Sequence, residues 1–409
     1  MIETLGHRGE GVLTLRGRTI YVPLTVPGDR VRITYAGERG TLLEILEPGP
    51  TRVPAPCPHF GACGGCQLQH VDEAAYTTFK TEGIKTALAQ RGIVADIAPL
   101  ARVPLGARRR ATLGVARTGK GIVLGFYEGQ SHALSNIETC FVLAQPLAEM
   151  LGALHRWLDR ILPAHARGSA HLTLADNGVD IDLALEKGHW REDAESVARR
   201  ALLPPGLGIV RLTIDGAVAA QLAPPQVSFE DMSVALPPRA FLQPTLSGEA
   251  LLRQWVREGV GDARRVADLF CGLGTFALPL AKTAAVLAVD TEDTALAALS
   301  DAARRHTGLK PVTVEQRDLM RSPVPAAALK AFDAVVFDPP RAGAAMQAAE
   351  IAAAGVARIV AVSCNPATFA RDAKTLIDQG YALDWLRPLD QFPYTAHIEL
   401  VAQFSKAQG

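Results

Sequence analysis

From residue 266 onward, short apolar strands alternate with helical segments, and this alternation constrains the fold more than any other feature of the chain. Strands that are apolar along their whole length belong in a sheet that helices cover on both faces. The predicted strands are Val266–Phe270, Ala285–Val289, Phe332–Phe337 and Arg358–Val362, and the predicted helices are Thr275–Lys282, Glu292–His306, Ala344–Ala354 and Pro366–Gln379. We therefore predict a doubly wound, Rossmann-like α/β domain, with functional residues at the C-terminal ends of its strands.

Two further regions precede this domain. Residues 1–50 predict a small β-barrel of the oligonucleotide-binding type, and any other small β-domain would give a similar pattern. Residues 51–238 mix helices with strands and predict a central α+β domain, which leaves 239–409 for the third domain. At about 150 residues per domain, the chain length fits this division. The predicted barrel strands are Val12–Leu15, Arg18–Val22, Arg30–Tyr35 and Gly40–Leu46, and the main predicted elements of the central region are helices Glu73–Gly92 and Pro146–Leu162 and strands Arg109–Arg117, Ile122–Tyr127 and His171–Ala175.

The charge balance excludes strongly basic or acidic tails, because Lys+Arg and Asp+Glu both number 42. A local basic face, and hence nucleic-acid binding, remains compatible with a neutral chain. No apolar run approaches the roughly 18 residues that span a bilayer, and residues 1–11 are polar, so we expect a cytoplasmic enzyme without a membrane partner. In a reducing cytosol the 6 cysteines favour metal binding or catalysis over disulfides.

Three of these cysteines form a compact motif. Cys57, Cys63 and Cys66 follow the spacing C-x5-C-x2-C among several glycines, and Cys140 is the only other cysteine before the α/β domain. Four thiolates hold a [4Fe–4S] cluster, which favours these four residues as its ligands. Zinc is the alternative, with His59 and His70 nearby, although zinc sites usually have two paired units. Free cysteines are the third interpretation.

A strand, a glycine loop and a helix start occupy residues 266–277. Gly272 and Gly274 allow close approach of a ligand, and Asp290 ends the next strand, where it is placed to bind ribose hydroxyls. The pattern fits a nicotinamide dinucleotide formally. Asp268, just before the glycines, favours S-adenosylmethionine, whose amino-acid end tolerates a carboxylate nearby. A purely structural glycine turn is the third interpretation.

Chemically useful side chains follow the later strands. Asp338 ends one strand, Cys364 ends the next, and Glu399 lies in a strand-like segment at 396–402. In a doubly wound sheet these positions share one edge. Cys364 precedes a helix, whose N-terminus is expected to lower the thiol pKa, and an inert buried cysteine is the alternative.

A thiolate that adds to uracil C6 makes C5 nucleophilic towards a sulfonium methyl group, and a base then removes the C5 proton. Cys364 is the predicted nucleophile and Glu399 the predicted base, although alone Glu399 would read as a solvated strand residue.

These motifs together resemble the TrmA/RlmD family of RNA (uracil-5-)-methyltransferases over most of the chain. The resemblance is carried by the cysteine motif and by Asp268–Gly274, Asp338–Gly343, Ser363–Thr368 and Phe392–Glu399. It implies a class I methyltransferase domain, S-adenosylmethionine as cofactor, a [4Fe–4S] cluster and a TRAM-like RNA-binding barrel. It also implies a monomer that acts on RNA, with 23S ribosomal RNA favoured over the T-loop of transfer RNA.

The resemblance also assigns the cofactor site, with Gln243, Phe270, Thr275, Asp290, Asp318 and Asp338 as its expected residues. The family often has Asn where this chain has Thr245, Thr275 and Asp318, and Glu at Asp290. Arg108, Arg109 and Arg110 resemble a basic stretch that could contact phosphate or the target base, and a solvated strand end is the alternative.

Other functions fit the motifs less well. An RNA cytosine-5 methyltransferase typically has a second cysteine beside the Asp-Pro motif, where this chain has Pro340 and Arg341. An amino-methyltransferase uses an aromatic residue after Asp-Pro-Pro, and Arg341 stands there instead. A dehydrogenase has no need of Cys364 and Glu399, and a pure RNA-binding module has no need of a cofactor loop.

Overall fold

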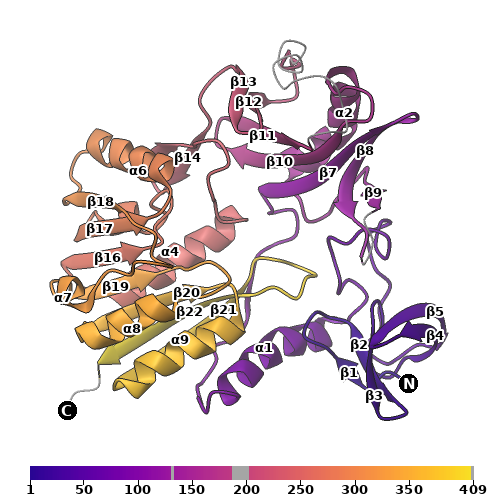
Figure 1. Cartoon of the computed structure of the whole chain (residues 1–409), viewed down its shortest axis with the longest axis horizontal. Coiled ribbons are helices and arrows are strands. Elements are labelled where there is room, and N and C mark those ends of the chain that lie inside the picture. Colours follow the sequence, from indigo (N-terminus) through magenta and orange to yellow (C-terminus); the bar gives the residue numbers. More distant parts are fainter. Residues whose placement is uncertain (130–132, 187–201, 407–409) are drawn as a thin grey trace.

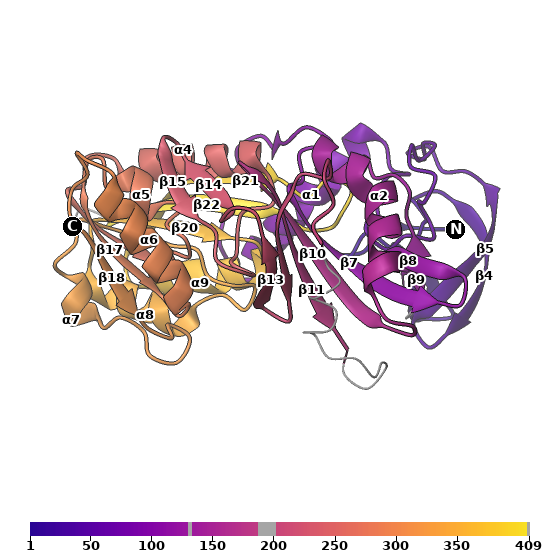
Figure 2. The same ribbon diagram turned by 90° about the horizontal axis from the view of Figure 1, so that it is seen from above.

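The computed structural model describes residues 1–129, 133–186 and 202–406. In these residues, three large sheets follow one another along the chain (Figure 1). Viewed from above, the N-terminal sheet and the C-terminal α/β layers lie at opposite ends, with the central sheet between them (Figure 2). No helix within the described ranges has the length and apolar character needed to cross a membrane.

The N-terminal sheet has five strands in the order β1-β2-β3-β5-β4. Their bounds are Thr4–Leu5 (β1), Gly11–Leu15 (β2), Arg18–Val22 (β3), Arg30–Ala36 (β4) and Arg39–Glu47 (β5). The four strands predicted from the sequence are confirmed, whereas β1 is too short to have a pattern of its own. A small core of Ile2, Leu13, Ile20 and Val22 holds this sheet together.

The cysteine motif leads into helix α1, Glu73–Ala89, which packs against helix α9, Pro366–Asp378. Asp72 is the N-cap of α1. Its side chain accepts a hydrogen bond from the backbone N–H of Ala75 at 2.8 Å, which stabilises the start of the helix. Strand β6, Ala101–Arg102, follows and joins the edge of the C-terminal sheet. This part of the central region therefore packs with the α/β layers.

The central sheet has seven strands in the order β13-β12-β11-β10-β7-β8-β9. Helix α2, Gln145–Ile161, covers one face with Leu147, Leu151, Leu154 and Leu158. A separate hairpin, Gln226–Phe229 (β14) and Met232–Ala235 (β15), connects this sheet to the C-terminal layers. The bounds of the sheet strands are Arg110–Thr118 (β7), Gly121–Tyr127 (β8), Leu134–Asn136 (β9), Arg167–Ala175 (β10), Gly178–Leu185 (β11), Ile209–Ile214 (β12) and Ala217–Gln221 (β13).

The C-terminal sheet has eight strands in the order β18-β17-β16-β19-β20-β22-β21-β6. Strands β16 to β20 are parallel, and β22 runs antiparallel between β20 and β21. The start of β22 therefore meets the C-terminal ends of the parallel strands at one edge. The strand bounds are Arg265–Leu269 (β16), Ala285–Asp290 (β17), Val312–Gln316 (β18), Ala334–Phe337 (β19), Arg358–Ser363 (β20), Tyr381–Asp390 (β21) and Glu399–Lys406 (β22).

Helices cover both faces of this sheet, as the apolar strands predict. Val266 faces the core formed with α4, α5 and α6, while its neighbour Ala267 faces the core formed with α7, α8, α9 and α1. The doubly wound α/β domain is thus confirmed. The helix bounds are Leu246–Val260 (α4), Ala277–Leu280 (α5), Asp293–Arg305 (α6), Ala326–Leu329 (α7) and Ala345–Ala354 (α8).

Candidate active site

Asp338 and Cys364 follow the neighbouring strands β19 and β20, as the sequence predicts. Hydrogen bonds join their two loops, because Asn365 Nδ2 and the Thr368 hydroxyl both donate to the carbonyl of Arg341, at 3.0 and 3.2 Å. Asn365 is also the N-cap of α9 and accepts from the backbone N–H of Ala367 at 3.0 Å. The helix cap therefore also fixes the loop that carries Asp338.

Cys364 is half-buried at this edge, not deep in the interior. Its thiol interacts electrostatically with Glu399, Asp338 and Arg341, which brings the predicted nucleophile and base into one site. Burial, followed by the two carboxylates, raises the pKa of Cys364 to about 11. The expected lowering of this pKa is therefore wrong. Cys364 precedes the N-cap by one residue, and burial and the carboxylates outweigh Arg341 and the helix terminus.

Glu399 is the first residue of β22 and is 5% exposed. Burial, and then the charge of Asp338, raises the pKa of Glu399 to about 8, and burial raises that of Asp338 to about 7. A carboxylate with a raised pKa is a stronger proton acceptor than an ordinary one in those molecules in which it is ionised. Glu399 is thus a buried carboxylate, not the solvated strand residue of the alternative interpretation.

Gln243 lies beside these groups and is buried. Its Nε2 donates to Asp338 Oδ2 at 3.3 Å, and its Oε1 accepts from Gln391 Nε2 at 2.9 Å. Gln391 also hydrogen-bonds to Glu399. The sequence analysis missed Gln391, because a single glutamine in a loop carries no recognisable signal.

Arg341, which acts electrostatically on Cys364, and its partner His397 were not predicted as site residues. Arg341 Nη2 lies 3.1 Å from His397 Nε2. Burial, and then the charge of Arg341, lowers the pKa of His397 to about 4, so the neutral ring accepts this hydrogen bond. The pair places a cation and a neutral imidazole at the entrance to the site.

Side chains of helix α1 hold the loop before Glu399 in place through hydrogen bonds and an ion pair. Lys80 and Asp390 form an ion pair of 2.9 Å with both side chains almost fully buried, and the Tyr76 hydroxyl donates to the other oxygen of Asp390 at 2.5 Å. Lys80 also donates to the carbonyl of His397. The backbone N–H groups of Gln67 and Leu68 donate to the carbonyl of Tyr394, at 2.7 and 3.0 Å. The segment after the cysteine motif is thus bound directly to the loop that precedes Glu399.

The glycine loop follows β16 and leaves space for a ligand. Gly272 has φ +52°, and a Cβ atom there would have no neighbour within 4 Å. Gly274 has φ +88°, and a Cβ atom there would lie 2.4 Å from Leu299. Glycine is therefore required at 274 by packing and at 272 by backbone conformation. Phe270 also takes a positive φ of 63°, which is uncommon for a bulky residue and typical of functional sites.

Two carboxylates frame this loop. Asp290 accepts hydrogen bonds from the backbone N–H groups of Gly272 and Glu292, at 2.8 and 3.0 Å. Asp268 is buried facing the backbone N–H of Ala277, and otherwise neither oxygen has a partner among the described residues. Burial, with Asp338 and Asp290 nearby, raises the pKa of Asp268 well above its usual value. A buried carboxyl group with no partner beyond this N–H is costly, which points to a bound ligand as a further partner.

Two other predicted cofactor residues lie away from this hydrogen-bond network. Thr275 lies in the loop just before α5 and is half-buried. Asp318 is exposed after the edge strand β18 and accepts from the backbone N–H of Met320 at 3.0 Å. It also forms a 3.6 Å ion pair with Arg321, so its carboxylate is held in its own turn.

The four cysteines of the proposed cluster gather from two segments. The thiols of Cys63 and Cys66 each interact electrostatically with those of Cys57 and Cys140. Gly64 donates to the carbonyl of Tyr127 at 3.0 Å, which brings the motif against β8. Over the described part of the chain, however, no three or more Cys, His, Asp or Glu side chains are arranged as a metal-binding group. The thiols are therefore near one another without forming a closed ligand set.

The two histidines of the zinc alternative have other contacts. The backbone N–H of Glu138 donates to His59 Nε2 at 3.3 Å. His70 is buried with its ring centroid 5.3 Å from that of Phe60.

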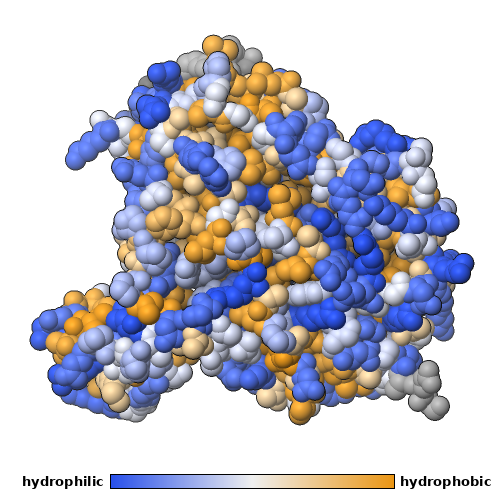
Figure 3. Space-filling model, turned by 180° about the vertical axis from the view of Figure 1, so that it is seen from behind, coloured by the Kyte–Doolittle hydropathy of each residue, from blue (hydrophilic) through white to orange (hydrophobic). Residues whose placement is uncertain are grey.

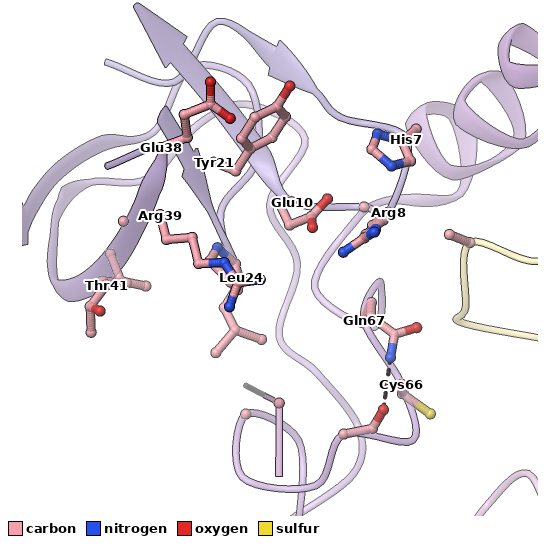
Figure 4. A pocket seen from close by; sticks show the side chains of 18 of the residues that line it. His7, Arg8, Glu10, Tyr21, Leu24, Glu38, Arg39, Thr41, Cys66 and Gln67 are labelled. Atoms are coloured by element: carbon pink, nitrogen blue, oxygen red, sulfur yellow. Dashed lines mark hydrogen bonds between the residues drawn. The ribbon is translucent and has the colours of Figure 1, made fainter. Parts of the chain in front are cut away.

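A groove of about 1180 Å³ runs between the N-terminal sheet, the cysteine motif and the loop before Glu399. From behind, the N-terminal sheet forms a separate lobe, and the surface is hollowed where it meets the rest of the molecule (Figure 3). Arg8, Arg39 and Tyr21 line the groove from the sheet, and Cys66 and Gln67 line it from the cysteine motif (Figure 4). His397 also lines it, so the groove leads to the candidate site.

Arg109 does not have the expected role in phosphate or base contact, and it is not a solvated strand end. It is 2% exposed, forms an ion pair with Glu249, and donates to the carbonyl of Gln243 at 3.0 Å. Arg110 donates to the carbonyl of Leu242 at 2.5 Å and stacks 5.0 Å from the exposed Phe241 ring. Arg109 and Arg110 thus position the segment that carries Gln243.

Comparisons with known proteins show which family the chain is similar to. A family model described as tRNA (Uracil-5-)-methyltransferase matches residues 225–406. The chain is 40% identical to an uncharacterized RNA methyltransferase of Rhizobium meliloti, an alignment that covers 99% of this chain and 98% of the relative. It is 32% identical to the 23S rRNA (uracil(1939)-C(5))-methyltransferase RlmD of Vibrio parahaemolyticus, over 99% of this chain and 95% of that one.

The fold of the whole chain also has a solved counterpart. It is similar to the tRNA (uracil-54, C5)-methyltransferase of Pyrococcus abyssi, solved in complex with S-adenosyl-L-homocysteine. The TM-score is 0.74 at 24% sequence identity, and the match covers 98% of this chain and 99% of that one. The two proteins therefore share one overall fold.

Proposed function

The chain belongs to the RNA (uracil-5-)-methyltransferase family, and from this premise we propose that it methylates C5 of a specific uridine in structured RNA through a covalent bond between Cys364 and uracil C6. The observation that supports the proposal most is the meeting of Cys364, Asp338 and Glu399 at one edge of the sheet. A dehydrogenase or a pure RNA-binding module has no use for that combination.

The reaction proceeds in three steps. The Cys364 sulfur bonds to uracil C6 as the thiol proton passes to Asp338, which leaves Glu399 free for the C5 proton, and the C5–C6 double-bond electrons move into an enolate. C5 would then bond to the methyl group that bound S-adenosylmethionine would supply, as the carbon–sulfur bond of the sulfonium breaks. Glu399 takes the C5 proton, the C5–C6 double bond re-forms, and the Cys364 thiolate departs. The raised pKa of Glu399 makes its ionised form a stronger base towards the C5 proton.

S-adenosylmethionine supplies the methyl group when bound. Gln243, Phe270, Thr275, Asp290, Asp318 and Asp338 are the residues proposed to line its site. The space above Gly272 and the unpaired carboxylate of Asp268 fit a ligand with a cationic amino-acid end. Thr275 and Asp318 are the least certain of these residues, because the family often has Asn at both positions. The Asp318 carboxylate also accepts a hydrogen bond from the backbone N–H of Met320 in its own turn.

Covalent trapping tests the mechanism. RNA that carries 5-fluorouridine at the target is expected to form a stable adduct with the protein when S-adenosylmethionine is present, since C5 then has no proton for Glu399 to remove. The adduct is measured as a shifted band in denaturing gels and by intact mass. An active preparation that methylates uridine RNA yet forms no adduct would show that the covalent scheme is wrong.

We further propose that Cys57, Cys63, Cys66 and Cys140 hold a [4Fe–4S] cluster that has a structural role in RNA recognition, not electron transfer. Four thiol donors suit this cluster, and two of them, Cys63 and Cys66, line the groove. Zinc and unligated thiols are the competing outcomes. The nearness of the motif to the loop before Glu399 supports a structural role.

Replacing Cys140 with serine is expected to remove the iron and weaken RNA binding, because a thiolate ligand is lost beside the groove. Protein purified without oxygen is analysed for iron, acid-labile sulfide and zinc, and RNA affinity is measured by filter binding. Cys364→Ala is the matched control and is expected to keep its iron. A folded, cluster-free protein with unchanged RNA affinity would contradict the role in recognition.

The favoured substrate is 23S ribosomal RNA, with transfer RNA as the alternative. The RlmD relative of Vibrio parahaemolyticus supports the first, and the Pyrococcus abyssi enzyme of the same fold supports the second. The groove with Arg8, Arg39 and Tyr21 is the proposed surface for the RNA strand, since cations and an aromatic ring are suited to phosphates and bases. Mapping 5-methyluridine in total RNA from a strain that lacks the gene distinguishes the two.

A further inference from the structure

We propose that Gln391 is a positioning residue for Glu399: its side-chain amide connects the base to Gln243 and fixes the direction of the Glu399 carboxylate towards the target carbon. The inference rests on the proposed function, because it assigns the means by which the base is oriented. Gln391 lies between β21 and β22 and is fully buried.

The amide of Gln391 is hydrogen-bonded at both its nitrogen and its oxygen. Nε2 donates to Gln243 Oε1 at 2.9 Å, and the side chain also hydrogen-bonds to Glu399. Oε1 accepts from the hydroxyl of Thr245 at 3.4 Å. A Cβ atom on Gly248 would lie 2.5 Å from this oxygen, so glycine there leaves the space that Gln391 occupies.

An amide is the side chain that these neighbours require. It has two N–H donors and one accepting oxygen, which matches two acceptors, Gln243 and Glu399, and one donor, Thr245. The hydrogen bond to Glu399 favours the ionised carboxylate, which is the form that removes a proton. Methionine would fill a similar volume without donating, and glutamate would add another carboxylate beside Glu399.

The contacts extend from Glu399 to the proposed cofactor side of the site. Gln391 joins Glu399 to Gln243, and Gln243 in turn donates to Asp338 at 3.3 Å. The backbone of Gln243 is held by Arg109, and Thr245 is the N-cap of α4. Glu399 is therefore oriented by rigid elements on both sides of the sheet edge. A base held in this way transfers protons faster than one on a flexible loop, because less of its catalytic rate is lost to misalignment.

Gln391→Met tests this role, with Gln347→Met as the matched control. Gln347 lies on helix α8 outside the site, is also fully buried, and hydrogen-bonds to the backbone of Val324. Single-turnover reactions on uridine RNA separate adduct formation from adduct resolution, and each is measured across pH. The thermal unfolding midpoints of both variants are measured, so that a rate change caused by lost stability can be recognised.

We expect Gln391→Met to form the adduct and to resolve it about 10- to 100-fold more slowly, the size expected for loss of a charge-assisted hydrogen bond. The pH midpoint of resolution is expected to move upward, because the ionised carboxylate loses a donor. Gln347→Met is expected to keep the wild-type resolution rate and midpoint. Should Gln391→Met be too unstable to study, the isosteric Gln391→Glu replaces it and is expected to slow resolution further.

A wild-type rate and pH midpoint in folded Gln391→Met or Gln391→Glu would overturn the inference. So would equal slowing in Gln347→Met, since the effect would then be one of general stability. Failure of the proposed function gives a different result: the wild-type protein itself would form no adduct with 5-fluorouridine RNA.

Discussion

Replacing Cys364 with alanine is expected to abolish both methyl transfer and adduct formation. Loss of an attacking sulfur removes the covalent route entirely, so the rate should fall on the order of 10⁴-fold or more. The side chain is half-buried at the sheet edge, and its removal leaves the hydrogen bonds of Asn365 and Thr368 in place. Incorporation of labelled methyl groups into RNA measures turnover.

The control for this variant is binding. Cys364→Ala is expected to bind RNA and S-adenosylmethionine about as well as the wild-type protein, measured by filter binding and calorimetry. Methyl transfer by the folded variant above the level measured without protein would contradict the assignment of Cys364 as nucleophile.

Replacing Glu399 with glutamine is expected to let the adduct accumulate on ordinary uridine RNA, because the base that removes the C5 proton is gone. General-base catalysis contributes about 10²- to 10⁴-fold, so resolution should slow by that amount while adduct formation persists. In the wild-type protein, resolution should become faster as pH rises through about 8, as Glu399 ionises. Quenched-flow gels measure both steps, and rapid resolution by the variant would reject Glu399 as the base.

The same variant is expected to be more stable than the wild-type protein at alkaline pH. The pKa of Glu399 is raised from 4.5 to about 8 in the folded state, so the folded chain holds a proton that the unfolded chain has lost. The stability contributed by this group is present below pH 4.5 and decreases as pH rises towards 8. Glutamine removes that loss, a gain on the order of a few kcal/mol above pH 8. Urea unfolding at acidic and alkaline pH measures it.

Much of the fold follows from local patterns. The parallel strands β16, β17, β19 and β20 lie within a few residues of their predicted ranges, because unbroken apolar runs indicate burial on both faces. The edge strand β18, Val312–Gln316, has no such run and was not predicted. The predicted helix at 275–282 is only Ala277–Leu280, and the last predicted strand, at 396–402, begins at Glu399 and runs to Lys406. Strand ends shift in this way because caps and turns, not periodicity, decide them.

The site was predicted in part, for a physical reason. Asp338, Cys364 and Glu399 could be placed together because the topology brings strand ends to one edge. The ionisation of Cys364 could not, since burial and carboxylates from other strands determine it. Gln391 and the burial of Arg109 also depend on partners far away in the sequence, at Gln243 and Glu249. Helix α1 was found as a helix, but nothing local indicated its contact with Asp390.

That contact limits how this protein could have been assembled in evolution. A piece of chain that starts at residue 239 would carry Asp390 without Lys80 and Tyr76, and Tyr394 without the two donors that follow the cysteine motif. A buried carboxylate stripped of its cation is a severe defect, so such a piece could not be exchanged freely between lineages as a ready-made catalytic module. Substrate choice and chemistry are then inherited as one unit, and a graft between relatives should succeed only when α1 travels with its loop.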